Sequence, residues 1–83
     1  MTTMNLCFDF KISGPDETTY WNTLLGNLTA DWTTDYQFGI CYDGPLEVIN
    51  VLINTITGLA ETAKGTLDVN VTMEVLQCKI TIG

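Results

Sequence analysis

The sequence predicts an α/β protein, with α+β as the near alternative, built as a two-layer open-faced sandwich in which both helices cover one face of the sheet. Three segments alternate between apolar and polar residues, and two segments with helical periodicity separate them. Each alternating segment has only one apolar face. Strands of a sheet that is covered on both sides are apolar throughout, so we expect one face of this sheet to be bare.

The order of these elements is βαβαβ, and all of them fit one domain at residues 1–83, because a chain of 83 residues is too short for two cores. Right-handed crossovers place successive helices on the same face only when the chain moves in one direction across the sheet. We therefore expect parallel strands in the order 1-2-3.

The first predicted strand spans residues 4–12, where apolar and polar side chains alternate. A helix should follow, because Ser13 can cap it, Pro15 suits its first turn, and the next two residues are acidic, as the helix dipole favours. Its apolar residues recur at helical spacing: Trp21, Leu24, Leu25 and Leu28. Residues 27–35 are expected to form a polar connection.

A second alternating strand is predicted at residues 36–43, with Tyr36, Phe38, Ile40 and Tyr42 facing inward. The following segment, residues 43–65, is the clearest helix of the chain, since a broad apolar face recurs at a period of 3.6 residues. Pro45 suits its first turn, and Gly65 ends it.

Residues 67–82 form the last predicted strand, whose alternation changes phase between Val75 and Leu76. A β-bulge there would turn both halves toward the same core. The alternative is a hairpin near residues 73–77 that supplies a fourth, antiparallel strand, but this stretch has no Gly, Pro, Asn or Asp for a tight turn, which favours the bulge. A strand of ~53 Å, against ~30 Å for the first, should leave unpaired edge groups that recruit another copy or a target.

The charge of the chain is one-sided: ten acidic residues face three lysines, without Arg or His, and the net charge is −7. Phosphate binding requires Lys and Arg, and an anionic membrane surface repels an acidic protein, so we expect neither nucleic acid nor membrane as a direct partner. A basic protein surface is the electrostatic complement. The alternative is that the charge only keeps a rather apolar domain in solution.

The three cysteines, Cys7, Cys41 and Cys78, are widely spaced and form no CxxC pair. Without His, a zinc site would need ligands from three separate strands, so we expect no metal and no cofactor. Free thiols in a reducing compartment are the simpler interpretation. Residues 1–12 lack a signal pattern, and no apolar run approaches the ~20 residues of a membrane span, so we expect a cytoplasmic protein, in the host cell if a phage encodes it.

Catalysis is not expected from this sequence. It has a single Ser, Ser13, at a predicted helix cap, and it has no glycine-rich phosphate loop. Four carboxylates could share the bare sheet face, but carboxylates on a wet surface are poor acids near neutrality: Asp9, Asp43, Asp68 and Glu74. We interpret this face as solvated polar surface.

Three surfaces are candidates for binding a partner. They are the bare sheet face, the rim where both helices begin, and the loop at residues 30–36, in which Trp32 between two acids resembles an aromatic anchor with a charged rim. The alternative for Trp32 is a core position that continues the apolar stripe of the first helix. The candidate partner-binding residues are Asp9, Asp31, Trp32, Asp35, Asp43, Glu47, Asp68 and Glu74.

These features predict a non-enzymatic protein-binding module. The first hypothesis is a small acidic inhibitor, of the anti-restriction, anti-CRISPR or toxin-immunity type, that occupies a cationic or nucleic-acid-binding surface of a nuclease or a similar complex. The alternative is a homo-oligomeric structural subunit of a virion or other assembly, with a homodimer formed through the long C-terminal strand. A small-ligand sensor domain is a third option.

Overall fold

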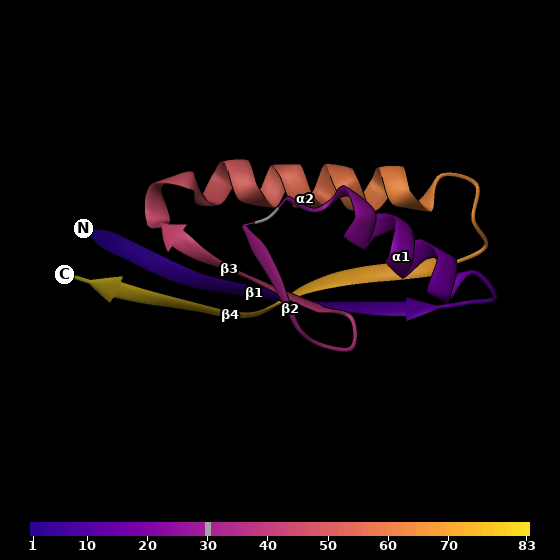
Figure 1. The fold of residues 1–83 in the computed structure, drawn as a ribbon, viewed down its shortest axis with the longest axis horizontal. Coiled ribbons are helices and arrows are strands. Elements are labelled where there is room, and N and C mark those ends of the chain that lie inside the picture. Colours follow the sequence, from indigo (N-terminus) through magenta and orange to yellow (C-terminus); the bar gives the residue numbers. More distant parts are fainter. Residues whose placement is uncertain (30) are drawn as a thin grey trace.

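Two helices and four strands make up the described part of the chain in a computed structural model of the protein (Figure 1). The structure describes residues 1–29 and 31–83, apart from the side chains of Asp35 and Tyr36. The elements are β1 (Thr2–Ser13), α1 (Glu17–Asn27), β2 (Trp32–Tyr36), β3 (Gly39–Pro45), the 3-10 turn η1 (Leu46–Val48), α2 (Ile49–Lys64) and β4 (Asn70–Ile82).

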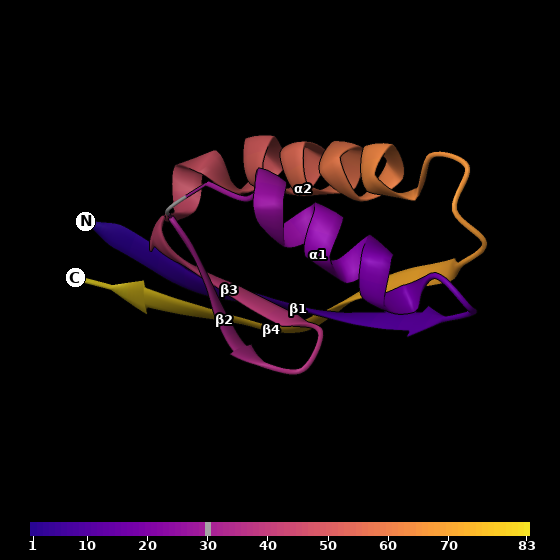
Figure 2. The same cartoon turned by 45° about the vertical axis from the view of Figure 1, so that its right-hand side comes forward.

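The four strands form one antiparallel sheet in the order β2-β3-β1-β4. Both helices lie on the same face of this sheet (Figure 2), which confirms the predicted two-layer α/β sandwich with one bare face. The succession β-α-β-β-α-β is that of ferredoxin-like folds. Such a fold hosts many unrelated functions, so it does not by itself indicate one.

The prediction of three parallel strands in the order 1-2-3 is wrong. Each helix does connect two parallel strands, but an antiparallel strand fills the position between them: β3 lies between β1 and β2, and β1 lies between β3 and β4. The extra strand is β2, which lies in the segment expected to be a polar connection. Its Trp32, Thr33 and Thr34 are residue types that suit strands, although the segment has no apolar alternation.

The predicted bulge in the last strand is confirmed, and a hairpin there is ruled out. Phe8 pairs with Val75 and Cys7 pairs with Gln77, which leaves Leu76 as the extra residue of β4. The extra residue resets the alternation, so the apolar residues on both sides of the bulge face the helices. β4 begins at Asn70 rather than at residue 67.

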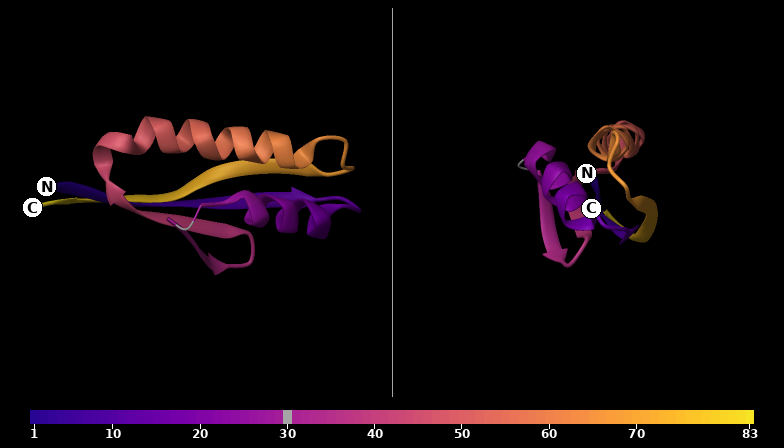
Figure 3. Two further views of the ribbon diagram at one scale, coloured as in Figure 1. Left: turned by 45° about the horizontal axis from the view of Figure 1, so that its top comes forward. Right: turned by 90° about the vertical axis from the view of Figure 1, so that its right-hand side faces the viewer.

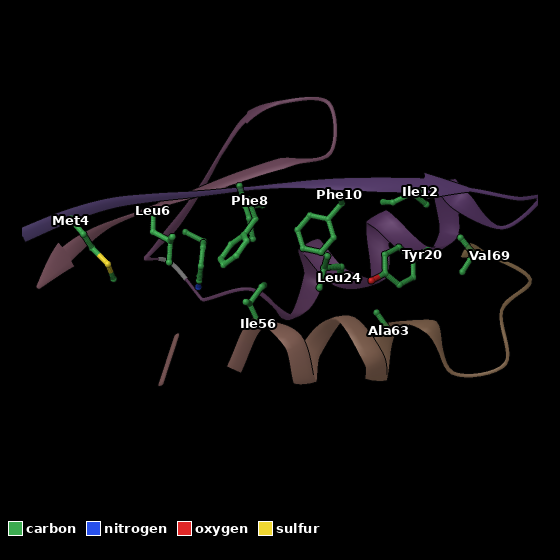
Figure 4. Packing of buried hydrophobic residues seen from close by; sticks show 12 residues of the cluster. Met4, Leu6, Phe8, Phe10, Ile12, Tyr20, Leu24, Ile56, Ala63 and Val69 are labelled. Atoms are coloured by element: carbon green, nitrogen blue, oxygen red, sulfur yellow. The ribbon is translucent and has the colours of Figure 1, made fainter. Parts of the chain in front are cut away.

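The core lies between the sheet and the two helices (Figure 4). One face of β1 supplies five of its twelve buried residues, because alternate residues of this central strand are buried: Met4, Leu6, Phe8, Phe10 and Ile12. Tyr20 of α1 is fully buried beneath α2, and its hydroxyl donates a hydrogen bond to the carbonyl oxygen of Ala60 at 3.1 Å. Burial raises the pKa of the Tyr20 hydroxyl above its ordinary value.

A disulfide joins Cys7 of β1 to Cys41 of β3 on the bare face. These residues are direct neighbours in the antiparallel register, and their Cα atoms lie 4.1 Å apart. The prediction of free thiols is therefore wrong for this pair. The predicted parallel arrangement of the strands would not place the two residues opposite each other, whereas the observed antiparallel one does. Cys78 is free and exposed.

The ends of the chain lie side by side at one end of an elongated molecule of 45 × 20 × 19 Å (Figure 3). There the Met1 amino group donates to the Gly83 carbonyl oxygen. The ends of β1 and β4 project beyond the first turn of α2 (Figure 1), which leaves that part of β4 without a helix above it.

Candidate protein-binding edge

β4 is an edge strand of thirteen residues, and its side away from β1 has no strand beside it within the described part of the chain. Near its start, Val71 and Met73 are half-buried against the core. Further along, the strand is uncovered: the exposed fraction is 57% for Val75 and Leu76, 50% for Ile80 and 84% for Ile82. Large apolar side chains in a row along an unpaired strand mark a surface that another chain can cover.

The backbone of β4 is available for pairing at these same residues. Phe10 of β1 donates its N–H to the carbonyl oxygen of Phe38, on the β3 side. Even-numbered residues of β1 therefore turn their backbone groups toward β3, and odd-numbered ones turn theirs toward β4, because these groups alternate along a strand. The β4 residues opposite the even-numbered ones must point away from β1: Val71, Met73, Val75, Cys78, Ile80 and Ile82.

We call these six residues the apolar edge. Their side chains lie on the helix-covered face, since cross-strand partners share a face and their partners in β1 include Phe8 and Phe10 of the core. The apolar edge thus combines unsatisfied hydrogen-bonding groups with hydrophobic side chains. Strand addition uses this combination, in which the backbone supplies affinity and alternate side chains supply specificity.

A groove of about 200 Å³ opens between α2 and the first half of the apolar edge. Val71 and Met73 form its floor, Ala60 and Thr57 of α2 form its wall, and Tyr20 also lines it. Glu61 and Lys64 are the charged residues of its lining. The groove can receive apolar side chains of a strand laid beside β4.

Two features that commonly protect a sheet edge, a bulge and a lysine, are also present in β4. The bulge falls in the middle of the strand, and regular pairing continues on both sides of it. Lys79 pairs with Asn5, so its side chain lies on the bare face rather than among the apolar side chains. Neither feature covers the apolar edge.

Over the described side chains, the bare face is polar and nearly neutral. Among the predicted binding residues, it carries Asp9, Asp43 and Glu74, together with Lys11 and Lys79. Asp9 forms a salt bridge with Lys11 at 3.1 Å, and Asp43 accepts a hydrogen bond from the Asn5 amide at 2.8 Å. The three acids are close to balanced by the two lysines, so this face is not the source of the net charge.

The other predicted acids whose side chains are described lie away from the bare face. Glu47 is exposed in η1, and Asp31 is exposed just before β2. Asp68, expected on the bare face, precedes β4 in the loop after α2, where its N–H donates to the Asp16 carboxylate at 2.8 Å. The side chain of Asp35 lies outside the described part of the structure.

Trp32 belongs to the core rather than to an exposed anchor. Only 9% of it is exposed, and its ring packs against Phe8 and Tyr42 at centroid distances of 6.1 and 5.6 Å. The core alternative for this residue is therefore confirmed.

Six of the nine acids whose side chains the structure describes lie away from the bare face, together with one lysine, Lys64. Four of these acids belong to the end of the molecule where α1 begins and α2 ends (Figure 1): Asp16, Glu17, Glu61 and Asp68. Of the four acids expected on the bare face, only Asp68 lies elsewhere, because the sequence does not fix where the last strand begins.

No group of three or more His, Cys, Asp or Glu side chains is placed to hold a metal ion among residues 1–29 and 31–83. Over the same residues, no helix is long and apolar enough to cross a bilayer. Comparisons with protein-family models, with curated proteins and with solved structures find no match to this chain.

Proposed function

We propose that the protein is a non-enzymatic protein-binding module, and more specifically a small acidic inhibitor of the anti-restriction, anti-CRISPR or toxin-immunity type. Its target is a cationic or nucleic-acid-binding surface of another protein. The observation that supports this proposal is the uneven distribution of charge: most of the net charge of −7 lies on the helix layer and its loops. A one-sided field of this kind speeds association with a basic partner.

The test is capture of targets from the lysate of the source cell, with the full chain as bait and elution by a salt gradient. We expect basic, nucleic-acid-binding proteins to elute as salt screens the attraction. Charge reversal on the helix side, at Glu17 and Glu61, should abolish capture. Reversal at Asp9 and Asp43 on the bare face changes the net charge equally and should leave capture largely intact.

The proposal would be abandoned if both double variants captured the same proteins equally well, or if binding did not respond to salt. In that case neither the position nor the sign of the charge decides what the protein binds.

The second candidate function is a homo-oligomeric structural subunit, which the apolar edge of β4 favours. Exposed apolar strands of this length recruit further strands, and identical copies are the usual occupants in assemblies. A subunit of this kind should form a defined oligomer in the purified state and should capture no basic protein from the lysate.

We also propose that the protein acts in the cytoplasm, of the host cell if a phage encodes it. A reducing compartment opposes disulfides, so the Cys7–Cys41 disulfide should be reduced inside the cell, and rapid alkylation of intact cells should label Cys7, Cys41 and Cys78. After purification in air, only Cys78 should be labelled, because Cys7 and Cys41 are in position to form their disulfide. Protection of the pair inside the cell would contradict this localisation.

A further inference from the structure

We propose that β4 pairs with β4 of a second copy of the chain, antiparallel and over its whole length, around a two-fold axis between Leu76 and Gln77. The two four-stranded sheets then become one continuous sheet of eight strands. This inference goes beyond the proposed inhibitor function, because it holds whichever target the acidic layer binds. It deepens the second candidate function, the homo-oligomeric subunit, by giving the register and symmetry of the contact.

The bulge allows this register. The apolar edge contains odd-numbered residues before Leu76 and even-numbered residues after it. An antiparallel copy can therefore place Val71 opposite the partner's Ile82, Met73 opposite the partner's Ile80, and Val75 opposite the partner's Cys78. Every one of these residues has outward backbone groups and an apolar side chain on the helix-covered face. An antiparallel pairing requires that opposing residues turn their backbone groups toward each other and place their side chains on the same face. This register meets both requirements.

Charge complementarity selects the same register. On the bare face it places Glu74 opposite the partner's Lys79, and the two-fold axis repeats this pair. Among the described residues of a single chain, neither Glu74 nor Lys79 forms an ion pair. Glu74 lies opposite Asp9, which carries a like charge. Opposite charges directly across two strands stabilise their pairing, and like charges destabilise it. A shift of two residues in either direction removes both ion pairs.

The groove beside α2 gives the partner's side chains a place to pack. Met73 and Val71 line it, and the proposed register puts the partner's Ile80 and Ile82 directly beside them. In one chain alone, Ile80 is 50% exposed and Ile82 is 84% exposed. A second copy thus covers the part of β4 that its own helix leaves bare.

A second copy fits better than an unrelated strand because the edge is complementary to itself. Such an interface is isologous, the usual form in homodimers. The axis is perpendicular to the sheet, so the helix layers of both copies stay on the same side. Binding of a basic target by the acidic layer remains open in the dimer.

The deciding experiment is sedimentation velocity of the full chain over a range of concentrations. The wild type should be a dimer. Glu74→Lys or Lys79→Glu alone replaces two attractive pairs with two repulsive ones and should weaken dimerisation by roughly tenfold or more. The double variant exchanges the charges, restores both pairs and should dimerise nearly as well as the wild type. A monomeric wild type, or a double variant as weak as the single ones, would refute the proposal.

A second pair of variants separates loss of dimerisation from loss of folding. Ile80→Lys places a charge in the centre of the apolar edge and should give a monomer with an unchanged circular dichroism spectrum. Val51→Lys is the matched control, because Val51 is an equally apolar, 66% exposed residue on α2 outside the proposed contact. It should remain a dimer. If both variants behave alike, β4 is not the interface.

Disulfide trapping measures the register. Val75→Cys introduces a thiol opposite the partner's Cys78, where the ~5.5 Å Cα separation of a hydrogen-bonded pair suits a disulfide. This variant should form a covalent dimer under mild oxidation. The wild type should not, since the two Cys78 residues are three positions apart along the strands. Cross-linking of the wild type would indicate a different register and overturn the proposed one.

Discussion

Tyr20 shows how a single side chain connects both helices with the core. Its ring is fully buried, and its hydroxyl satisfies the Ala60 carbonyl oxygen on α2. The sequence identified the helix that carries Tyr20, but not this role, because the bond joins residues forty positions apart. Trp32 illustrates the same limit. A tryptophan suits a surface anchor and a core position equally well, and only the pairing of β2 with β3 decides between these two positions.

We expect Tyr20→Phe to lower the free energy of unfolding by about 1 kcal/mol, because it removes a partly buried hydrogen bond between the two helices. Thr23→Val, which removes an exposed hydroxyl bonded within α1, should change it by less than about 0.5 kcal/mol. Urea unfolding at neutral pH measures both. Equal effects would mean that the Tyr20 hydroxyl does not connect the helices.

The same variant tests the pH dependence. Burial raises the pKa of Tyr20 above its ordinary 10.0, so the folded state holds this proton at a pH where the unfolded state loses it. The stabilisation is complete below pH 10.0 and is lost as the pH rises through the folded-state pKa. Tyr20→Phe should therefore lose less stability than the wild type between neutral and strongly alkaline pH.

At the scale of elements, β1, α1, α2 and the bulge of β4 could be predicted from periodicity, and Gly65 correctly marked the end of α2. The predicted cap of α1 was wrong: Ser13 ends β1, and α1 begins at Glu17 with Asp16 at its N-cap. The phase change at Val75–Leu76 sufficed to find the bulge, since the side-chain period of a strand is two. β2 could not be found, because its Trp32–Tyr36 segment is short and lacks alternation. The antiparallel order also escaped prediction: the hairpin turns at Gln37–Phe38, where Phe38 adopts a positive φ of 65° without Gly or Asn.

The bulge gives a test at this scale. Deleting Leu76 removes the extra residue and leaves every pair between β1 and β4 in place, so the free energy of unfolding should change by less than about 1 kcal/mol. Deleting Met73 is the control. It forces Glu74 or Thr72 against the core and should cost more than about 2 kcal/mol. Chemical unfolding that shows equal losses would contradict the assigned position of the bulge.

For the whole molecule, three of the four acids expected on the bare face, Asp9, Asp43 and Glu74, were placed correctly. Asp68 was not, because its layer depends on where the last strand begins. The exposed edge strand could not be identified, since it depends on the order of the strands, which no local sequence pattern encodes. The charge itself has a global effect. A net charge of −7 on 83 residues makes the folded state repel itself.

Because salt screens this repulsion, we expect the midpoint of thermal unfolding to rise by a few degrees between about 10 mM and about 300 mM NaCl, where the Debye length falls from ~30 Å to below ~8 Å. Scanning calorimetry at one protein concentration measures it. The single salt bridge of the described residues, Lys11 with Asp9, is too exposed to reverse the trend. A falling midpoint would show that attraction between charges outweighs repulsion.

The place of β1 in the middle of the sheet has a consequence for how the chain acquires its structure. β1 is made before the other strands of the sheet, yet one of its two neighbours is β4, and the pairing extends to Thr2 with Ile82. Closing so long a loop is slow. A nascent chain that has not yet reached residue 70 would carry its central strand half-paired, so synthesis of the thirteen residues of β4 is the step that completes the sheet.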